Sequence, residues 1–220
     1  MMLEMKGVSF RYDTREVLCD IDLALADGEW LGIVGANGAG KSTLLKLILG
    51  LIEPDAGTIT RFRDPNFKAW HEIAYMRQEG FLTMRAFPAS VEEIISMPLM
   101  IPVRKREMTR AAMHAEVERA MRLVGLHGFA KKKISDLSGG ERQKVQIAQS
   151  IVAHPRLLLM DEPTTGLDER ATRELEHLFA GLKRREAVSA IVISHDATWL
   201  RNVVDRTLFL IDGRLGEHNA

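Results

Sequence analysis

The stretch GANGAGKST, residues 35–43, constrains the fold of this chain more than any other. Gly35, Gly40, Lys41 and Ser42 occupy the defining positions of a G-x-x-x-x-G-K-[ST] phosphate loop. Glycines let backbone N–H groups surround an anion, and a following helix presents the positive end of its dipole to it. The apolar run EWLGIVG precedes the loop, and KSTLLKLILG follows with helical character. We therefore expect a strand, a loop and a helix that together bind nucleotide phosphates.

The rest of the chain alternates between strand-like and helix-like patterns. Short apolar runs separated by turns fill the N-terminal part, and residues 151–220 read as strand, helix, strand and hairpin. Residues 88–135 are rich in methionine and show helical spacing. This order predicts an α/β fold with a P-loop NTPase core, in which helices flank a mostly parallel sheet. An antiparallel β part is expected at the N-terminus and an α-helical subdomain as an insertion. We predict a single domain over 1–220, with its core at 1–87 and 151–220 and the helical subdomain, including a glycine turn, at about 88–150.

Composition narrows the possible partners. The chain has 30 basic and 30 acidic residues, so nothing supports a nucleic-acid surface, which normally shows a basic excess. Its longest apolar runs, such as LILGLI, fall short of the roughly 18 residues of a membrane span. The N-terminus lacks the pattern of a secretory signal. Cys19 is the only cysteine, and we expect it to be a small buried side chain. These features predict a cytoplasmic protein that reaches a membrane only through a partner chain.

Two carboxylates follow the apolar run LLLM. Asp161 and Glu162 are expected at the carboxyl end of a strand, where open α/β sheets bind their ligands. Asp161 can hold Mg²⁺, and Glu162 can deprotonate an attacking water, which is general-base catalysis worth about 10²–10⁴-fold in rate. The alternative is an ordinary acidic loop after a buried strand, which a neighbouring phosphate loop makes the weaker interpretation.

A second glycine turn, LSGGERQ at residues 137–143, opens another helical segment, and DEPTTGLD follows it. Together these two stretches resemble the ATP-binding cassette family. Three further segments, FRYD, AYMRQE and VISHD, occur in the order that the family has them, and TGLD at the end of DEPTTGLD also matches the family. The resemblance covers about residues 3–215. Departures are Arg77, where proline is common, and Gln149, where arginine is common.

The resemblance implies a role for each matched residue. Tyr12 would stack on adenine, Gln78 would join the subdomains near Mg²⁺ and water, and His195 would contact the γ-phosphate. The implied nucleotide-binding residues are Tyr12, Gly35, Ala36, Asn37, Gly38, Ala39, Gly40, Lys41, Ser42, Thr43, Ser138, Gly139, Gly140 and Asp168. The implied metal ligands are Ser42, Gln78 and Asp161, and the implied catalytic residues are Glu162, His195 and Gln78.

The resemblance also implies cofactors and an assembly. ATP and Mg²⁺ would lie at the interface of a head-to-tail dimer, either a homodimer or a cassette heterodimer. Each ATP would lie between the phosphate loop of one subunit and the LSGGE turn of the other. An integral membrane permease would dock on the insertion after Gln78, with a substrate-binding protein if the system imports. This places the chain at the inner face of the cell membrane, without nucleic acid as a partner.

Several functions stay open at this stage. The first is the energy-coupling subunit of a membrane transporter, and the alternatives are a soluble cassette ATPase acting on ribosomes or DNA and a passive nucleotide sensor. FPASVEEII, residues 87–95, is similar to a segment of zinc and manganese importer ATPases and suggests divalent metal-ion uptake. An export-type or lipid-related cassette is the alternative. Six methionines are expected to fill the core between helices or to form a docking surface: Met84, Met97, Met100, Met108, Met113 and Met121.

Overall fold

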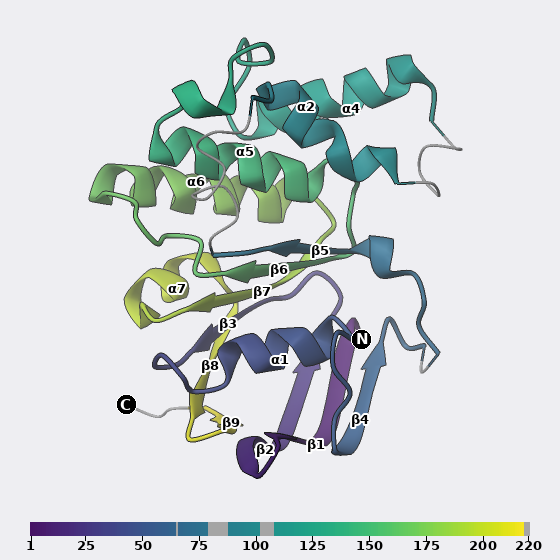
Figure 1. Ribbon diagram of the computed structural model, residues 1–220. Coiled ribbons are helices and arrows are strands. Elements are labelled where there is room, and N and C mark those ends of the chain that lie inside the picture. The colour runs from purple at the N-terminus through teal and green to yellow at the C-terminus, as the bar shows by residue number, and fades with distance from the viewer. Residues whose placement is uncertain (65, 79–87, 102–107, 218–220) are drawn as a thin grey trace.

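A six-stranded sheet runs through the middle of the molecule (Figure 1). The computed structural model describes residues 1–64, 66–78, 88–101 and 108–217. Five strands are parallel, and the last forms an antiparallel hairpin with its neighbour. In spatial order the strands are β5 (Ile73–Met76), β6 (Leu157–Asp161), β7 (Ser189–Ser194), β3 (Trp30–Val34), β8 (Arg206–Ile211) and β9 (Arg214–Gly216).

The central strands are buried on both faces, which explains their unbroken apolar sequences. In β6, Leu157 and Leu159 pack into one core together with helix α1 (Lys41–Ile48). Leu158 and Met160 point to the opposite face and pack into a second core beneath the other helices. This two-residue alternation puts one layer of helices on each side of the sheet.

A second, three-stranded antiparallel sheet packs on α1, on the side away from the central sheet (Figure 1). Its order is β2 (Arg15–Leu25), β1 (Leu3–Tyr12) and β4 (Ala56–Arg61). Helix α1 therefore lies between two sheets, where most of its length is buried. The mixed α/β fold with an N-terminal antiparallel part confirms the predicted fold class.

Most of the remaining helices cover the opposite face of the central sheet and extend away from it (Figure 1). The helices are α2 (Val91–Ser96), α4 (Arg110–Leu123), α5 (Gly139–Ile151), α6 (Glu169–Arg185) and α7 (Ala197–Val203), with short 3-10 turns η1 (Trp70–Glu72), η3 (Met97–Met100) and η4 (Ile134–Asp136). Helices α2 and α4 pack on α5, which in turn packs against the sheet. The helical character of the segment between β5 and β6 is thus as expected.

The methionines of this segment differ in burial. Met121 is fully buried, and Met108 and Met113 are partly buried against the helical core. Met97 and Met100 are 42% and 50% exposed. Met84 lies outside the described residues.

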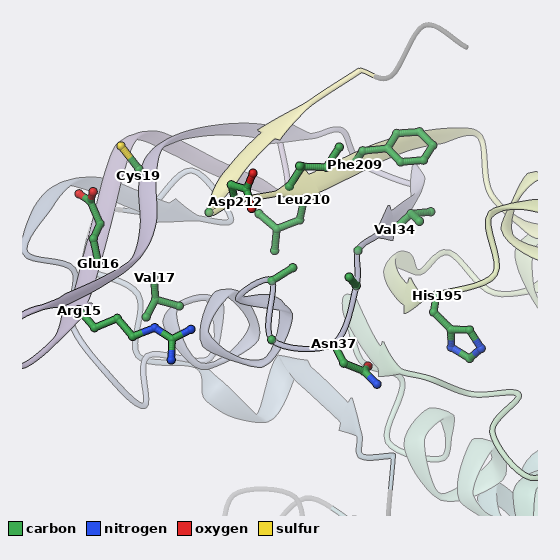
Figure 2. A pocket seen from close by; sticks show the side chains of 16 residues that line it. Arg15, Glu16, Val17, Cys19, Val34, Asn37, His195, Phe209, Leu210 and Asp212 are labelled. Carbon is green, nitrogen blue, oxygen red and sulfur yellow. The ribbon is translucent and has the colours of Figure 1, made fainter.

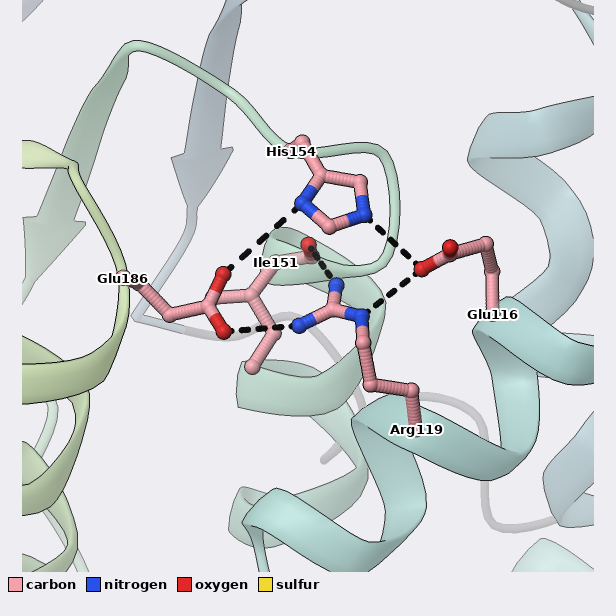
Figure 3. Close-up of polar contacts among 5 residues, drawn as sticks. All are labelled: Glu116, Arg119, Ile151, His154 and Glu186. Carbon is pink, nitrogen blue, oxygen red and sulfur yellow. Dashed lines mark hydrogen bonds and ion pairs between the residues drawn. The ribbon is translucent and has the colours of Figure 1, made fainter.

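One polar junction ties three helices together (Figure 3). Arg119 of α4 donates to Glu116 and to Glu186, each over 2.7 Å, and to the carbonyl oxygen of Ile151 over 3.2 Å. Glu186 caps the C-terminus of α6, and Ile151 ends α5. Nε2 of His154 lies 2.8 Å from Glu116 Oε2 and completes the junction.

Cys19 departs from the expectation. Its side chain is half-buried rather than buried, and a guanidinium nitrogen of Arg214 lies 3.1 Å from its sulfur. Strand β2 lies in the outer sheet, and the backbone N–H of Cys19 donates to Gly213 between β8 and β9. Cys19 also lines a cavity that is described below.

Candidate functional site

The predicted phosphate loop joins the end of β3 to the start of α1. Gly40 is the N-cap of α1 and has φ 105°, a conformation that side-chain-bearing residues rarely adopt. A Cβ added at Gly40 would also lie 2.9 Å from a methyl carbon of Leu18. No side chain of the described residues caps this helix, so its first N–H groups are not satisfied by a capping residue there. An uncapped helix N-terminus behind a glycine loop suits an anion.

Lys41 pairs with Glu162 in a buried position. Lys41 Nζ donates to the carbonyl oxygen of Gly35 over 2.7 Å and lies 3.3 Å from Glu162 Oε1. The two side chains are only 8% and 5% exposed. Glu162 Oε1 makes no hydrogen bond to any described residue, so its contact with Lys41 is ionic. The carboxylate thus has one buried oxygen with acceptor capacity to spare.

The other oxygen of Glu162 contacts His195. Nδ1 of His195 lies 2.8 Å from Glu162 Oε2, and the imidazole is largely exposed while the carboxylate is buried. The backbone N–H of Glu162 donates to Ile193 over 2.9 Å, which fixes the residue at the end of β6 with φ 49°. Glu162 is therefore held between the lysine of the phosphate loop and a histidine that follows β7.

Asp161 lies beside Glu162 in a crowded, negative environment. Burial, followed by the charge of Glu162, raises the pKa of Asp161, and the charge of Lys41 opposes this. The hydroxyl of Tyr75 donates to Asp161 Oδ2 over 3.5 Å. Burial, together with the Asp161 charge, raises the pKa of Tyr75 to about 12, so this hydroxyl stays a donor. Two carboxylates against one lysine make a site that a further cation would stabilise.

A cavity of about 310 Å³ gathers most of the predicted nucleotide and metal residues. Its lining includes Tyr12, Asn37, Gly38, Gly40, Lys41, Ser42, Thr43, Gln78, Asp161 and Glu162. The hydroxyl of Ser42, the amide of Gln78 and the carboxylate of Asp161 are oxygen donors of the kind that Mg²⁺ prefers, so these residues fit the ion. Arg15 and Val17 also line the cavity, and sequence reasoning missed them. Their position shortly after Tyr12 in the sequence is the only feature of the sequence that could have indicated them.

A larger cavity of about 570 Å³ lies against the same loop (Figure 2). Gly35, Ala36, Ala39 and His195 line it, together with Asn37 and Gly38, which line both cavities. Figure 2 shows Phe209, Leu210 and Asp212 along the side formed by the β8–β9 hairpin. The loop residues therefore have accessible space on two sides.

The second glycine turn lines neither of these cavities. Ser138 is the N-cap of α5, and its hydroxyl accepts from the N–H of Glu141 over 3.2 Å, while Glu141 accepts from the N–H of Ser138 over 2.7 Å. Asp168 likewise caps α6 by accepting from the N–H of Ala171. A Cβ added at Gly140 would lie 3.4 Å from Ala171 Cβ, so the two helix starts are neighbours. Ser138, Gly139, Gly140 and Asp168 thus form a separate group.

The two departures from the family pattern make contacts of their own. Gln149 donates to the carbonyl oxygen of Ile94 over 3.1 Å, which joins α5 to α2. The carbonyl oxygen of Arg77 accepts from Gln146 over 2.8 Å, which joins α5 to the segment that precedes Gln78. Both positions therefore connect α5 to its surroundings.

Fold and site together define a class of protein. A glycine loop with a buried lysine, a pair of strand-end carboxylates and a histidine against one of them make a P-loop nucleotide hydrolase. The sequence model described as ABC transporter matches residues 18–165. The chain belongs to the ABC transporter family and is an ATPase, which confirms the resemblance read from its sequence. Among the described residues, no helix is long and apolar enough to cross a membrane.

Relatives with different cargoes match nearly the whole chain. It is 31% identical to the zinc uptake system ATP-binding protein ZurA of Listeria monocytogenes, over 99% of this chain and 87% of that protein. It is 37% identical to the aliphatic sulfonates import ATP-binding protein SsuB of Cupriavidus pinatubonensis, over 97% of this chain and 67% of that protein. A dimeric ATP-binding cassette solved in a post-hydrolysis state with ADP and phosphate shares the fold, with a TM-score of 0.80, 24% identity and coverage of 99% and 98%.

Proposed function

We propose that the chain binds ATP in the 310 Å³ cavity and hydrolyses it in a head-to-tail dimer that drives a separate permease. The observation that carries the catalytic part is the position of Glu162 between Lys41 and His195. A buried carboxylate oxygen without a hydrogen-bond partner among the described residues is suited to accept a proton from an attacking water.

Each residue of the cavity receives one task. Tyr12, which is 42% exposed, offers its ring to adenine, and the loop N–H groups surround the phosphates. When ATP binds, Lys41 moves its contact from Glu162 to the outer phosphate oxygens. Oε1 of Glu162 is then free to accept a proton from the attacking water. His195 keeps the carboxylate oriented and faces the γ-phosphate. Mg²⁺, held by Ser42, Gln78 and Asp161, supplies charge neutralisation on the phosphates when bound.

The second glycine turn argues for the dimer. Ser138 and its neighbours open a helix N-terminus that lines neither cavity of its own chain. In the proposed dimer this turn binds the γ-phosphate of an ATP held by the other subunit, with Asp168 beside it. A cassette with the same fold is a dimer while ADP and the cleaved phosphate are both still bound, which supports this arrangement. ADP lacks the γ-phosphate, so hydrolysis weakens the interface.

A groove beside the edge strand β5 offers a place for the permease. It is a cavity of about 330 Å³ lined by residues of β5, η3 and α5 and their flanking segments: His71, Ile73, Ala74, Tyr75, Pro98, Ile101, Gln149, Ser150, Ala153 and Pro155. Met97 and Met100 are exposed on η3 near it. We propose that a cytoplasmic helix of the permease docks here and holds the chain at the inner face of the membrane.

The cargo is proposed to be a divalent metal ion. The zinc uptake relative supports this over nearly the whole chain, and so does the FPASVEEII segment, whose first residue lies outside the described residues. Such an importer also needs a substrate-binding protein outside the membrane. The sulfonate-import relative favours an organic anion as the second candidate. In this proposal the ATPase subunit does not contact the cargo, so the permease decides between the two candidates.

Two measurements test this function. ATPase activity of the purified chain should rise more than linearly with protein concentration, because active sites form only in dimers. Strict proportionality over a wide dilution series, from a proven monomer, would contradict the dimer. Capture of the tagged chain from detergent-solubilised membranes should bring down a hydrophobic permease. Co-purification of ribosomes or DNA instead would replace transport by the soluble alternative.

A further inference from the structure

Tyr75 is in contact with two different parts of the molecule. It lies on β5, the edge strand, and is one of the residues that line the 330 Å³ groove. Its hydroxyl nevertheless reaches Asp161 Oδ2, on the neighbouring strand β6, at 3.5 Å. The register explains this reach, because Tyr75 pairs with Leu159 and Asp161 lies two residues further along on the same face.

Asp161 has few other ways to be oriented. Among the described residues, Tyr75 is the one side chain that makes a hydrogen bond to its carboxylate. Glu162 and Lys41 act on Asp161 through their charges rather than through hydrogen bonds. A carboxylate that holds a metal usually accepts a hydrogen bond from a neighbour, which fixes the oxygen that faces the ion.

We infer that Tyr75 is a positioning residue for Asp161, whose hydroxyl fixes one carboxylate oxygen and leaves the other for Mg²⁺. This inference rests on the magnesium role proposed above for Asp161. The distance of 3.5 Å is long for a hydrogen bond between hydroxyl and carboxylate. Such contacts in ligand-free sites commonly shorten when the site is loaded. Because Tyr75 is also one of the residues that line the groove, the residue that orients Asp161 lies beside the proposed docking site.

A purely structural role makes a different prediction. The ring of Tyr75 packs with residues of the α1 core, and the guanidinium of Arg77 lies 5.8 Å from its centroid. Tyr75→Phe keeps that packing and removes only the hydroxyl. If packing is the whole role, the variant should resemble the wild type in every property that depends on metal.

The experiment measures metal binding directly. Mn²⁺ binding to the chain, saturated with a non-hydrolysable ATP analogue, is followed by electron paramagnetic resonance. Tyr75→Phe should weaken Mn²⁺ by about tenfold, the lower end of the loss seen when a second partner of a metal ligand is removed. Affinity for the analogue in EDTA should stay unchanged. Ile73→Val, on the same strand and the same groove, is the matched control and should leave Mn²⁺ binding unaltered.

The outcomes separate this inference from the proposed function. Asp161→Asn is measured in parallel, and if it leaves Mn²⁺ binding intact, the magnesium role of Asp161 itself is wrong. If Asp161→Asn weakens Mn²⁺ and Tyr75→Phe does not, only the role of Tyr75 is overturned. An equal loss of analogue affinity in EDTA for Tyr75→Phe would also overturn it, because the hydroxyl would then support the fold of the cavity rather than the metal.

Discussion

The phosphate loop and the second glycine turn both open a helix, but they differ in how the N–H groups of that helix are satisfied. At α1, Gly40 offers no side chain, and the helix start faces a cavity that contains a lysine and two carboxylates. At α5, Ser138 and Glu141 satisfy each other's N–H groups in a capping box, and the turn lines neither of the two cavities beside the loop. A helix whose first N–H groups are left without a capping side chain is locally less stable until an anion binds them. A capped helix N-terminus is stable without a ligand.

This difference indicates which of the two helix starts can bind a nucleotide first. The loop lies beside the buried charges and is proposed to bind the nucleotide within one chain. The turn is already capped within its own chain and is proposed to contact a phosphate held by another chain. Three experiments can break or sharpen this comparison.

The largest effect is expected at Glu162, which pairs with the lysine of the phosphate loop. Glu162→Gln should keep ATP binding and lower turnover by about 10²–10⁴-fold, because it removes the proton acceptor without disturbing the phosphate cradle. Calorimetry with an ATP analogue and a steady-state ATPase assay measure the two quantities. Glu174→Gln, an exposed change on α6, is the control and should retain activity. Near-normal turnover in Glu162→Gln would remove this residue as the base.

The next effect is expected at the turn. Ser138→Arg should leave ATP binding by the single subunit nearly intact and abolish the more-than-linear rise of activity with concentration. A bulky cation at the start of α5 blocks the approach of the second subunit. Ser138→Ala serves as control, because it loses the cap, worth about 0.5–2 kcal/mol of stability, without adding bulk. Normal hydrolysis by Ser138→Arg would show that the turn does not act across an interface.

The smallest effect concerns the acid stability of the turn. A backbone hydrogen bond from Ser138 is the main reason that the pKa of Glu141 lies below its ordinary value of 4.5, and burial opposes this. A lowered pKa stabilises the fold above the ordinary value, and this contribution is lost as the pH falls through the folded-state pKa. The loss of unfolding free energy as the pH falls below the ordinary value of 4.5 and through the lowered folded-state pKa should therefore be smaller in Glu141→Gln than in the wild type.

Urea unfolding at several pH values measures this difference. Glu53→Gln is the matched control, since Glu53 makes no hydrogen bond or ion pair among the described residues. An identical pH dependence in Glu141→Gln and the wild type would mean that the capping box contributes nothing to stability.

Local sequence patterns predicted much of this molecule. The strand, loop and helix around Lys41, the helix Glu169–Arg185 and the hairpin of β8 and β9 are where their patterns placed them. Each is specified by residues close together in the chain. Strand β5 was not predicted, because IAYM is four residues long and its partner β6 lies about eighty residues away.

Contacts within the site could be predicted only in part. Motif spacing indicated that Lys41 and Glu162 serve one nucleotide, but their direct pairing depends on β6 and β3 lying on either side of β7. That order is set by packing between distant strands. The contact of Tyr75 with Asp161 depends likewise on register across β5 and β6, and no local pattern near Tyr75 signals it.

The Arg119 junction lies at one end of α5, so a small rotation of the helix about it would produce a larger displacement at the other end. It holds α4 to the C-terminal ends of α5 and α6, whereas Ser138 and Asp168 sit at the opposite, N-terminal ends of those helices. Helix α5 has 13 residues, so at about 1.5 Å per residue its arm is about 20 Å long. A swing of about 10° around the junction would move Ser138 by about 3 Å, roughly the length of one hydrogen bond. A small rotation at the Arg119 junction would therefore be large enough to make or break the proposed contact of the turn with a phosphate.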